Sequence, residues 1–298
     1  CNVAVGSQSL KTNTTGLRNS ALGHNSLISN TEGASNSAFG TGALAANTTG
    51  GCNTGMGHNA LADNTTAGNN TAFGFQALKA NTTGFQHVAV GACALDSNTT
   101  GETNTAVGHA SLCDNTTGSN NTGIGKNALL NNTTASCNTA VGRDALKLTT
   151  TGCRNVAVGN GSLKTNTEGD QNVAVGREAL GVATTADSNT AVGFDSMQAT
   201  TTGAENTSIG TNSLFSNTTG CQNTASGVNT MYTNTEGCQN TAAGRQALYS
   251  NTTGDGHVAV GYNSLLNNTT ADFNSAVGRQ ALFTNTTGTR NVAVGLNA

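Results

Sequence analysis

The sequence contains no proline and no tryptophan, and only 9% of its residues carry a charged side chain. The net charge is −3 without any basic cluster, which argues against nucleic acid as a partner. No apolar run approaches the ~20 residues that a membrane-spanning helix needs. We therefore expect no membrane insertion in this segment.

What the sequence has instead is one short repeat. It divides without insertion or deletion into a partial unit at 1–16, complete units over 17–288, and a partial unit at 289–298. With Leu17 as position 1, the consensus is x-x-N-T-A-V-G-x-x-A-L-x-x-N-T-T-G. Position 7 is Gly in every copy and position 15 is Thr in every copy. A fixed 17-residue period predicts an all-β parallel β-solenoid (β-roll) of about 17.5 coils.

The regular spacing also bears on domain organisation. A solenoid grows in one dimension, so we expect residues 1–298 to form a single continuous repeat domain. Disorder is the alternative for a polar, weakly charged chain, but it gives no reason to keep Gly, Leu and Thr in strict register. The chain starts and stops in mid-unit and shows no signal peptide, so we expect a segment of a longer fibrous chain.

The 27 charged residues avoid most positions of the repeat. They occur only at positions 1, 2, 8, 9, 12, 13 and 16. Because an unpaired charge is costly to bury, the other positions are candidates for the interior. Positions 4 to 6 favour a strand, and this strand is charge-free on both faces, as in sheets covered on both sides. We therefore expect a homo-oligomer, with a trimer of parallel solenoids favoured and its strands facing a shared axis. A monomer is the alternative.

The remaining positions predict turns and ladders. Gly at position 7 predicts a tight turn with positive φ, and the Ala-Leu pair at 10 and 11 predicts a second, shorter strand. Asn at positions 3 and 14 predicts side-chain ladders between coils. Position 6 is large at Phe39 and Phe73 and small at Ser226 and Ala243, which predicts an interior that narrows along the chain.

Two sets of residues represent these positions. The predicted core and interface residues are Val5, Gly6, Leu10, Val90, Val107, Gly108, Val158, Gly159, Leu163, Val260 and Leu265. The predicted ladder of the return turn includes Asn13, Thr14, Asn47, Thr48, Asn251 and Thr252.

The strand motif resembles a known family. The stretches NVAVGSQSL from Asn2, NVAVGNGSL from Asn155 and NTSIGTNSL from Asn206 are similar to the head repeats of YadA-like trimeric autotransporter adhesins. The 17-residue form with A-L and N-T-T-G also resembles arrays in phage tail fibres. The resemblance implies a left-handed β-roll with three chains side by side. Adhesin-head repeats are shorter than the repeat of this chain, and they lack the Leu rank and the N-T-T turn.

No catalytic or metal-binding constellation is apparent. His24, His58 and His109 fall at position 8, whereas His87 and His257 replace the Asn of position 3, and none repeats at ligand spacing. Asp144 and Glu178 share position 9, but they lie two coils apart, each beside its own Arg. We therefore expect no enzymatic activity, no cofactor and no metal.

Eleven N-T-T sequons and eight cysteines leave chemistry open. The sequons could carry N-glycans in a secreted chain, but glycans on stacked coils would crowd, which favours a structural Asn ladder.

Cys221 and Cys238 share position 1 of neighbouring coils, close enough for a disulfide, although parallel side chains do not aim at each other. Cys137 and Cys153 are a weaker pair. An even number of cysteines fits an extracellular setting.

Three functions compete on this basis. The first is an extracellular structural or adhesive fibre segment, on a cell surface, in a secreted filament or on a virion, with a host-surface or glycan ligand left open. The second is an ice-binding solenoid that uses Thr ranks. From the sequence, its outward Thr rank is the single file at position 16, interrupted by three Glu. The third is a carbohydrate-binding or carbohydrate-processing β-helix, which would need carboxylates clustered on neighbouring coils.

Overall fold

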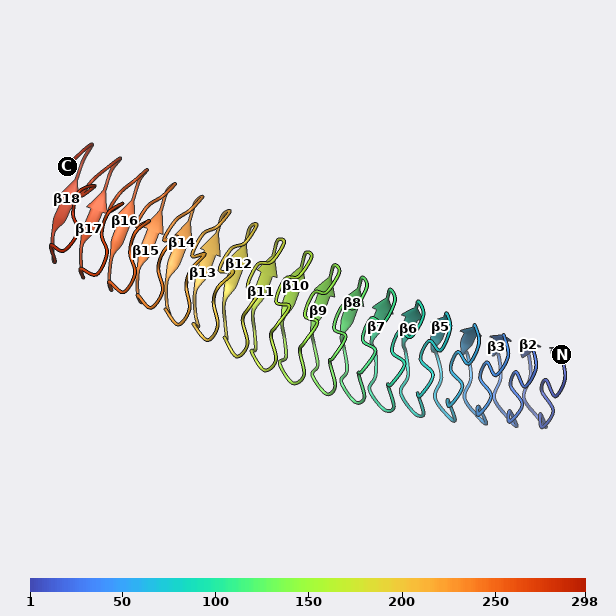
Figure 1. The fold of residues 1–298 in the computed structure, drawn as a ribbon. Coiled ribbons are helices and arrows are strands. Elements are labelled where there is room, and N and C mark those ends of the chain that lie inside the picture. Colours follow the sequence, from blue (N-terminus) through green and yellow to red (C-terminus); the bar gives the residue numbers. More distant parts are fainter. The chain divides into compact units, whose positions relative to one another are not determined.

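The structure is a computed structural model that describes all 298 residues. It contains 18 short strands and no helix, and its coils, one for each sequence repeat, form a parallel β-solenoid (Figure 1). Contacts divide the chain into two compact units, Cys1–Thr151 and Gly152–Ala298. The predicted fold class is confirmed, and each unit is described by itself below.

Every coil contributes one three-residue strand. The first unit holds β1 Val3–Val5, β2 Ser20–Leu22, β3 Ser37–Phe39, β4 Thr54–Met56, β5 Thr71–Phe73, β6 Val88–Val90, β7 Thr105–Val107, β8 Thr122–Ile124 and β9 Thr139–Val141. The second unit holds β10 Val156–Val158, β11 Val173–Val175, β12 Thr190–Val192, β13 Thr207–Ile209, β14 Thr224–Ser226, β15 Thr241–Ala243, β16 Val258–Val260, β17 Ser275–Val277 and β18 Val292–Val294. Within each unit, consecutive strands pair in parallel with a register of one repeat, as Thr105 with Thr122 and Thr190 with Thr207. These strands are the predicted positions 4 to 6.

The strand places position 5 inside and positions 4 and 6 outside. Ala106 and Ala174 at position 5 are fully buried, whereas Val260 at position 6 is 38% exposed. The prediction that position 6 lines the interior is therefore wrong. Phe73 and Ser226 lie on the outer surface, so their different sizes cannot make the interior narrow along the chain.

The Ala-Leu pair does not form a second strand, contrary to the prediction. Position 9 and the Leu of position 11 both adopt left-handed backbone, with φ of 53° at Ala110 and 52° at Leu112. Left-handed residues interrupt the extended backbone of a strand. The two residues between which the chain bends place the side chains of positions 10 and 11 in the core. Leu163 and Leu265 are fully buried as a result.

The invariant Gly of position 7 ends each strand, as predicted. Gly108 has a φ of +135°, and a Cβ added there would lie 2.6 Å from the carbonyl oxygen of Gly125 in the next coil. Both the backbone conformation and the close approach of the next coil exclude a larger residue. The same holds for Gly6 and Gly159, with φ of +124° and +137°.

Backbone hydrogen bonds between coils continue well beyond the strands. The N–H of Leu112 donates to the carbonyl of Ala128 at 2.9 Å, and the N–H of Gly125 donates to the carbonyl of Val107 at 2.8 Å. Turns therefore have partners in the neighbouring coil, as buried backbone groups require. This ladder compensates for strands of only three residues.

Candidate interaction surface

The outward side chains of the sheet form a charge-free surface, called here the outer sheet face, made of positions 4 and 6. Its aliphatic members include Ile124 and Ile209, exposed by 40% and 48%. The predicted residues Val5 and Val158 are also exposed, and Val90 and Val107 are partly so. These valines are surface residues of the single chain, and only the leucines among the predicted apolar residues belong to its core, although Leu10 in the first coil is half-buried.

Hydroxyl groups line one side of the same face. Position 4 is Ser or Thr in most coils and Val in the rest. In the first unit these hydroxyl residues are Ser20, Ser37, Thr54, Thr71, Thr105, Thr122 and Thr139; in the second they are Thr190, Thr207, Thr224, Thr241 and Ser275. The outer sheet face therefore presents a hydroxyl-rich file at position 4 beside an apolar file at position 6.

The two edges of this face carry charges of opposite sign. All eight charged residues at positions 1 and 16 are acidic, whereas the five at position 8 are Lys or Arg. The acidic residues are Glu32, Glu102, Glu168, Asp170, Asp187, Glu236, Asp255 and Asp272; the basic ones are Lys126, Arg143, Arg177, Arg245 and Arg279. Position 2 adds three Arg and one Glu to the acidic edge, which stays net acidic, and position 9 adds Asp144, Glu178 and Asp195 to the basic edge, which stays net basic.

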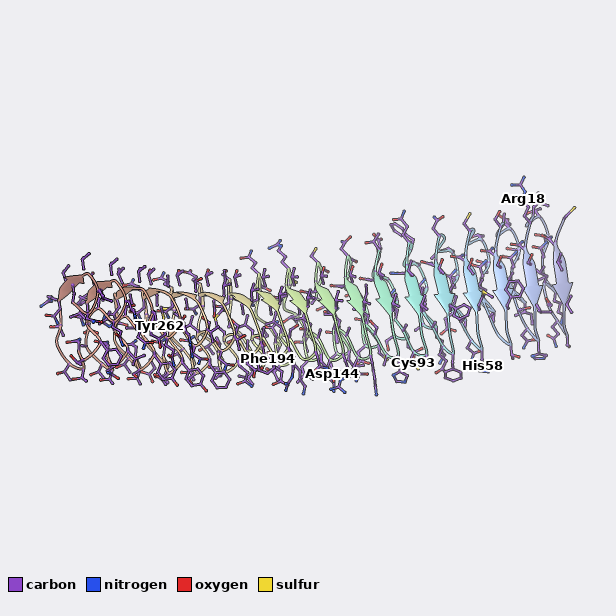
Figure 2. The ribbon with its side chains drawn as sticks, turned by 90° about the horizontal axis from the view of Figure 1, so that it is seen from above. Arg18, His58, Cys93, Asp144, Phe194 and Tyr262 are labelled. Carbon is purple, nitrogen blue, oxygen red and sulfur yellow. The ribbon has the colours of Figure 1, made fainter.

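The figures place these edges on opposite sides of the strands. In Figure 2, Arg18 from position 2 lies beyond one end of the strands, and His58 and Asp144 from positions 8 and 9 lie beyond the other. Two basic residues contact acidic neighbours within the chain: Arg143 lies 3.4 Å from Asp144, and Arg177 lies 3.2 Å from Glu178. The predicted carboxylates Asp144 and Glu178 are thus partly exposed, each in an ion pair with its own Arg, and they are not brought together.

Rows of aromatic and Arg side chains occupy the edge at positions 8 and 12 in the second unit. The rings of Phe215, Tyr232 and Tyr249 stack in consecutive coils, with centroids 5.1 and 5.3 Å apart. Arg245 and Arg279 lie over the ring of Tyr262 at 6.0 and 5.8 Å. Each of these rings has at least one face in contact with a ring or an Arg of another coil, which leaves less aromatic surface to stack on a sugar. Sequence reasoning missed the rows, although the recurrence of aromatic residues at the repeat spacing was a visible signal.

The structure brings the predicted Asn and Thr residues of the return turn together in ladders. Asn47 donates from Nδ2 to Asn30 Oδ1 at 2.8 Å and to the carbonyl of Gly50 at 3.0 Å. The Thr48 hydroxyl donates to the carbonyl of Thr65 at 3.1 Å. The equivalent bonds are made by the following residues: Asn13 to Gly16, Thr14 to Thr31, Asn251 to Asn234 and Gly254, and Thr252 to Thr269. Because Asn47 and Asn251 are fully buried, their side chains leave no room for a glycan.

Asn at position 3 closes each coil. Asn36 Nδ2 donates to the carbonyl of Gly50 at 2.8 Å, and Asn36 Oδ1 accepts the N–H of Asn53 at 2.9 Å. Position 17 thus accepts from the Asn of both position 3 and position 14. A single buried carbonyl joins the two predicted ladders.

His87 replaces this Asn without changing the hydrogen-bond pattern. Its Nε2 lies 2.7 Å from the carbonyl of Gly101, and its Nδ1 accepts the N–H of Asn104 at 3.1 Å. This arrangement assigns the proton to Nε2 of a neutral ring. Burial lowers the pKa of His87 to about 4, and burial also lowers the pKa of His257 at the same position. His24, His58 and His109 are exposed or partly exposed, as predicted for position 8.

Cys221 and Cys238 are both thiols in the structure. Cys221 and Cys238 nevertheless contact each other, with their sulfur atoms 2.8 Å apart. Burial raises the pKa of Cys113 to about 12, with Asp114, Asp96 and Cys93 adding to the effect. The possible disulfide between Cys221 and Cys238 therefore stays a prediction, and its two sulfur atoms are in contact.

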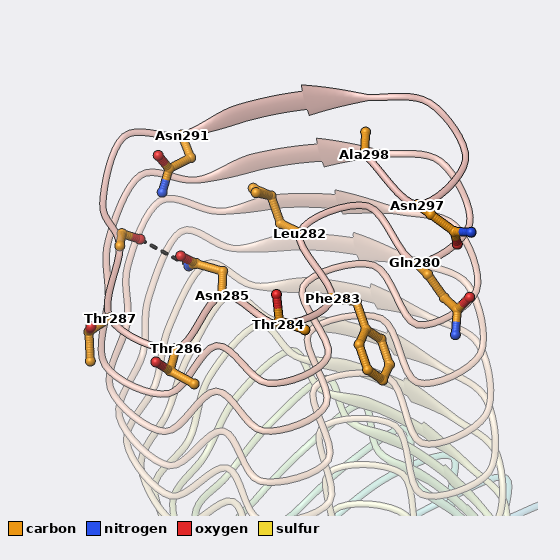
Figure 3. Close-up of a pocket in the computed structure, with 11 residues that line it drawn as sticks. Gln280, Leu282, Phe283, Thr284, Asn285, Thr286, Thr287, Asn291, Asn297 and Ala298 are labelled. Carbon is orange, nitrogen blue, oxygen red and sulfur yellow. Dashed lines mark hydrogen bonds between the residues drawn. The ribbon is translucent and has the colours of Figure 1, made fainter.

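A pocket lies at the last coils (Figure 3). Leu282 and Asn285 line it, and both belong to positions that are fully buried in earlier coils. The pocket is therefore the uncovered cross-section of the coil stack. No three His, Cys, Asp or Glu side chains are grouped closely enough to hold a metal ion. No helix of the structure could span a membrane.

No protein-family model matches the chain, and no curated protein matches it. The similarity to adhesin-head and tail-fibre repeats stays a prediction based on the residues quoted above.

Proposed function

We propose that the chain is a segment of an extracellular structural or adhesive fibre, in which parallel copies associate through the outer sheet face. The observation that carries this proposal is the exposure of an apolar file along a surface without any charge. Ile209 is 48% exposed, and Val158 and Val277 are 36% and 40% exposed. Contiguous apolar surface of this kind is typical of protein–protein interfaces.

The charged edges support a parallel arrangement of the copies. A rotation axis along the stacking direction would bring the acidic edge of one copy to the basic edge of the next. A two-fold axis along the strands would instead place acidic edge against acidic edge, which is unfavourable. Charge complementarity thus favours a closed ring of parallel copies, and a trimer with the strands towards the axis is the form that we propose.

In such a fibre, the varying side chains at positions 9, 12 and 13 would remain on the outside. Each side chain would recur once in every copy, which suits multivalent contact with a surface or a glycan. The fibre would provide reach and stiffness because each coil is hydrogen-bonded to the next.

Aspartate substitutions on the outer sheet face test the proposal. The variant Ile124→Asp, Val158→Asp, Ile209→Asp adds three charges to this face, and we expect it to dissociate the oligomer because its side chains point away from the chain's own core. The matched control, Thr117→Asp, Thr185→Asp, Thr219→Asp, adds the same charge at position 16, where Glu occurs naturally in three coils. Sedimentation velocity should show a smaller species for the first variant alone. A wild-type mass for the Ile124→Asp, Val158→Asp, Ile209→Asp variant would reject the outer sheet face as the interface.

Ice binding is the second candidate function, and one observation favours it. The hydroxyl-rich file at position 4 lies on the same parallel sheet as the apolar file at position 6, a surface that the sequence alone did not reveal. The two functions require the same face, so they exclude each other for one copy. Thermal hysteresis at millimolar protein would support ice binding, and its absence together with an oligomer would support the fibre.

A further inference from the structure

Side chains at position 1 share a contact that runs from one coil to the previous one. The side chain accepts the backbone N–H of the residue one repeat earlier. Ser119 Oγ accepts from Glu102 at 3.0 Å, and Asp272 Oδ1 accepts from Asp255 at 2.9 Å. The position-1 side chains therefore lean along the stack towards the preceding coil.

This lean explains the position of Cys238. Its sulfur accepts the N–H of Cys221 at 3.0 Å, just as Ser119 and Asp272 accept from their preceding coils. The same orientation places Cys238 Sγ 2.8 Å from Cys221 Sγ, closer than van der Waals contact. The sequence-based objection, that stacked side chains do not aim at each other, fails at this position.

We propose that Cys221 and Cys238 form an oxidative cross-link between neighbouring coils. Cys221 and Cys238 are the two cysteines that share position 1 of neighbouring coils. Both sulfurs are on partly exposed residues, so a small reagent can reach them.

The reaction needs a low-molecular-weight disulfide, such as oxidised glutathione, as the oxidant. One cysteine thiolate attacks a sulfur of the reagent, which forms a mixed disulfide and releases one thiol of the reagent. The second cysteine then attacks the protein sulfur of the mixed disulfide and releases the other thiol. The protein loses two hydrogen atoms, and the reagent gains them as two thiols.

Closing one coil covalently restricts the unfolded chain. The oxidised protein is therefore expected to unfold at a temperature several degrees above that of the reduced protein. This expectation does not depend on the proposed fibre function.

The protein sequence permits a direct test. The intact chain is incubated with oxidised glutathione, its remaining thiols are alkylated under denaturing conditions, and it is digested with trypsin. Residues 178–245 form one tryptic peptide that holds Cys221 and Cys238 and no other cysteine. We expect this peptide to be unalkylated and lighter by two hydrogen atoms. After cleavage at Glu236, the two pieces should stay joined until they are reduced.

Cys238→Ser is the matched variant. Ser accepts the preceding N–H at Ser119 and Ser136, so the substitution keeps the backbone contact and removes the cross-link. In this variant Cys221 should be alkylated, and oxidation should no longer raise the unfolding temperature. Cys221→Ser is the second variant if the first does not fold. Alkyl label on both cysteines of the wild-type peptide, or a link from either one to another chain, would overturn the proposal.

Discussion

His87 Nδ1 accepts the backbone N–H of Asn104, the bond that Asn36 Oδ1 makes to Asn53 elsewhere in the solenoid. Its Nε2 reaches the carbonyl of Gly101, as Asn36 Nδ2 reaches that of Gly50. A neutral imidazole thus has the donor and acceptor of an amide in the same places. Protonation would turn the acceptor into a second donor facing an N–H, so this position is sensitive to pH.

Replacing both buried histidines by Asn should remove a pH dependence of stability. Burial lowers the pKa of His87 from 6.5 to about 4, so the unfolded chain takes up the proton first as the pH falls. Stability is therefore lost between about pH 6.5 and pH 4, by about 3 kcal/mol for His87 alone. Urea unfolding at several pH values should show that His87→Asn, His257→Asn loses less stability than wild type over this range. Parallel curves for the two proteins would contradict the assignment.

Gly108→Ala should destabilise the solenoid by about 3 kcal/mol. The added Cβ would clash with the next coil, and a residue with a side chain is strained at a φ of +135°. That Cβ would lie 2.6 Å from the carbonyl oxygen of Gly125. The control is Gly161→Ala at position 9, where the nearest atom is a side-chain carbon of Glu178 at 3.4 Å. Thermal unfolding should show a much smaller loss for the control. Equal losses would mean that the contact between coils at position 7 is not as close as described.

Glycine should have opposite effects at two alanines of one coil. Ala110 has a φ of 53°, so Ala110→Gly relieves left-handed strain and should raise stability by roughly 0.5 kcal/mol. Ala106 is a fully buried strand residue, and Ala106→Gly should lower stability by about 1 kcal/mol. Chemical denaturation of both variants checks the signs. A loss of stability in Ala110→Gly would argue that position 9 does not adopt left-handed backbone.

Thr200→Asn should stabilise the protein. Thr200 replaces the ladder Asn of position 14, and its buried hydroxyl has no hydrogen-bond partner. An Asn there can donate to the carbonyl of Gly203 and accept from Asn217, which should contribute about 1–2 kcal/mol. Thr202→Asn, on the exposed side of the same turn, is the control and should change little. If Thr200→Asn gave no gain in unfolding temperature, the Asn ladder would not be a source of stability.

Much of the coil was readable from the sequence because its constraints are local and repeated. The charge-free positions predicted the strand at Thr105–Val107, and the invariant Gly108 predicted the turn after it. The recurrence of Asn at position 14, which never carries a charge, predicted a side-chain ladder. In the structure Asn47 forms this ladder through hydrogen bonds to Asn30 and Gly50. Each of these inferences used one residue type that tolerates few alternatives.

The remaining features depended on how the coil bends, which composition did not reveal. Leu112 was predicted to lie in a second strand, yet both Leu112 and Ala110 before it are left-handed, and the frequent Asn, Asp and Gly at position 9 were the overlooked signal. Without knowledge of that bend, the sequence did not show whether the side chain of position 6 points into the core or towards solvent. The contact of Cys221 with Cys238 required the lean of position 1, which no sequence pattern specifies.

The outer sheet face is central to this account because it decides what the solenoid does. The native mass of the wild-type chain, measured by light scattering after size exclusion, tests it most directly. A β-rich species near three times the 29.6 kDa chain mass is the result that we predict. A β-rich species at 29.6 kDa itself would leave the apolar file of the face in water and contradict the fibre proposal.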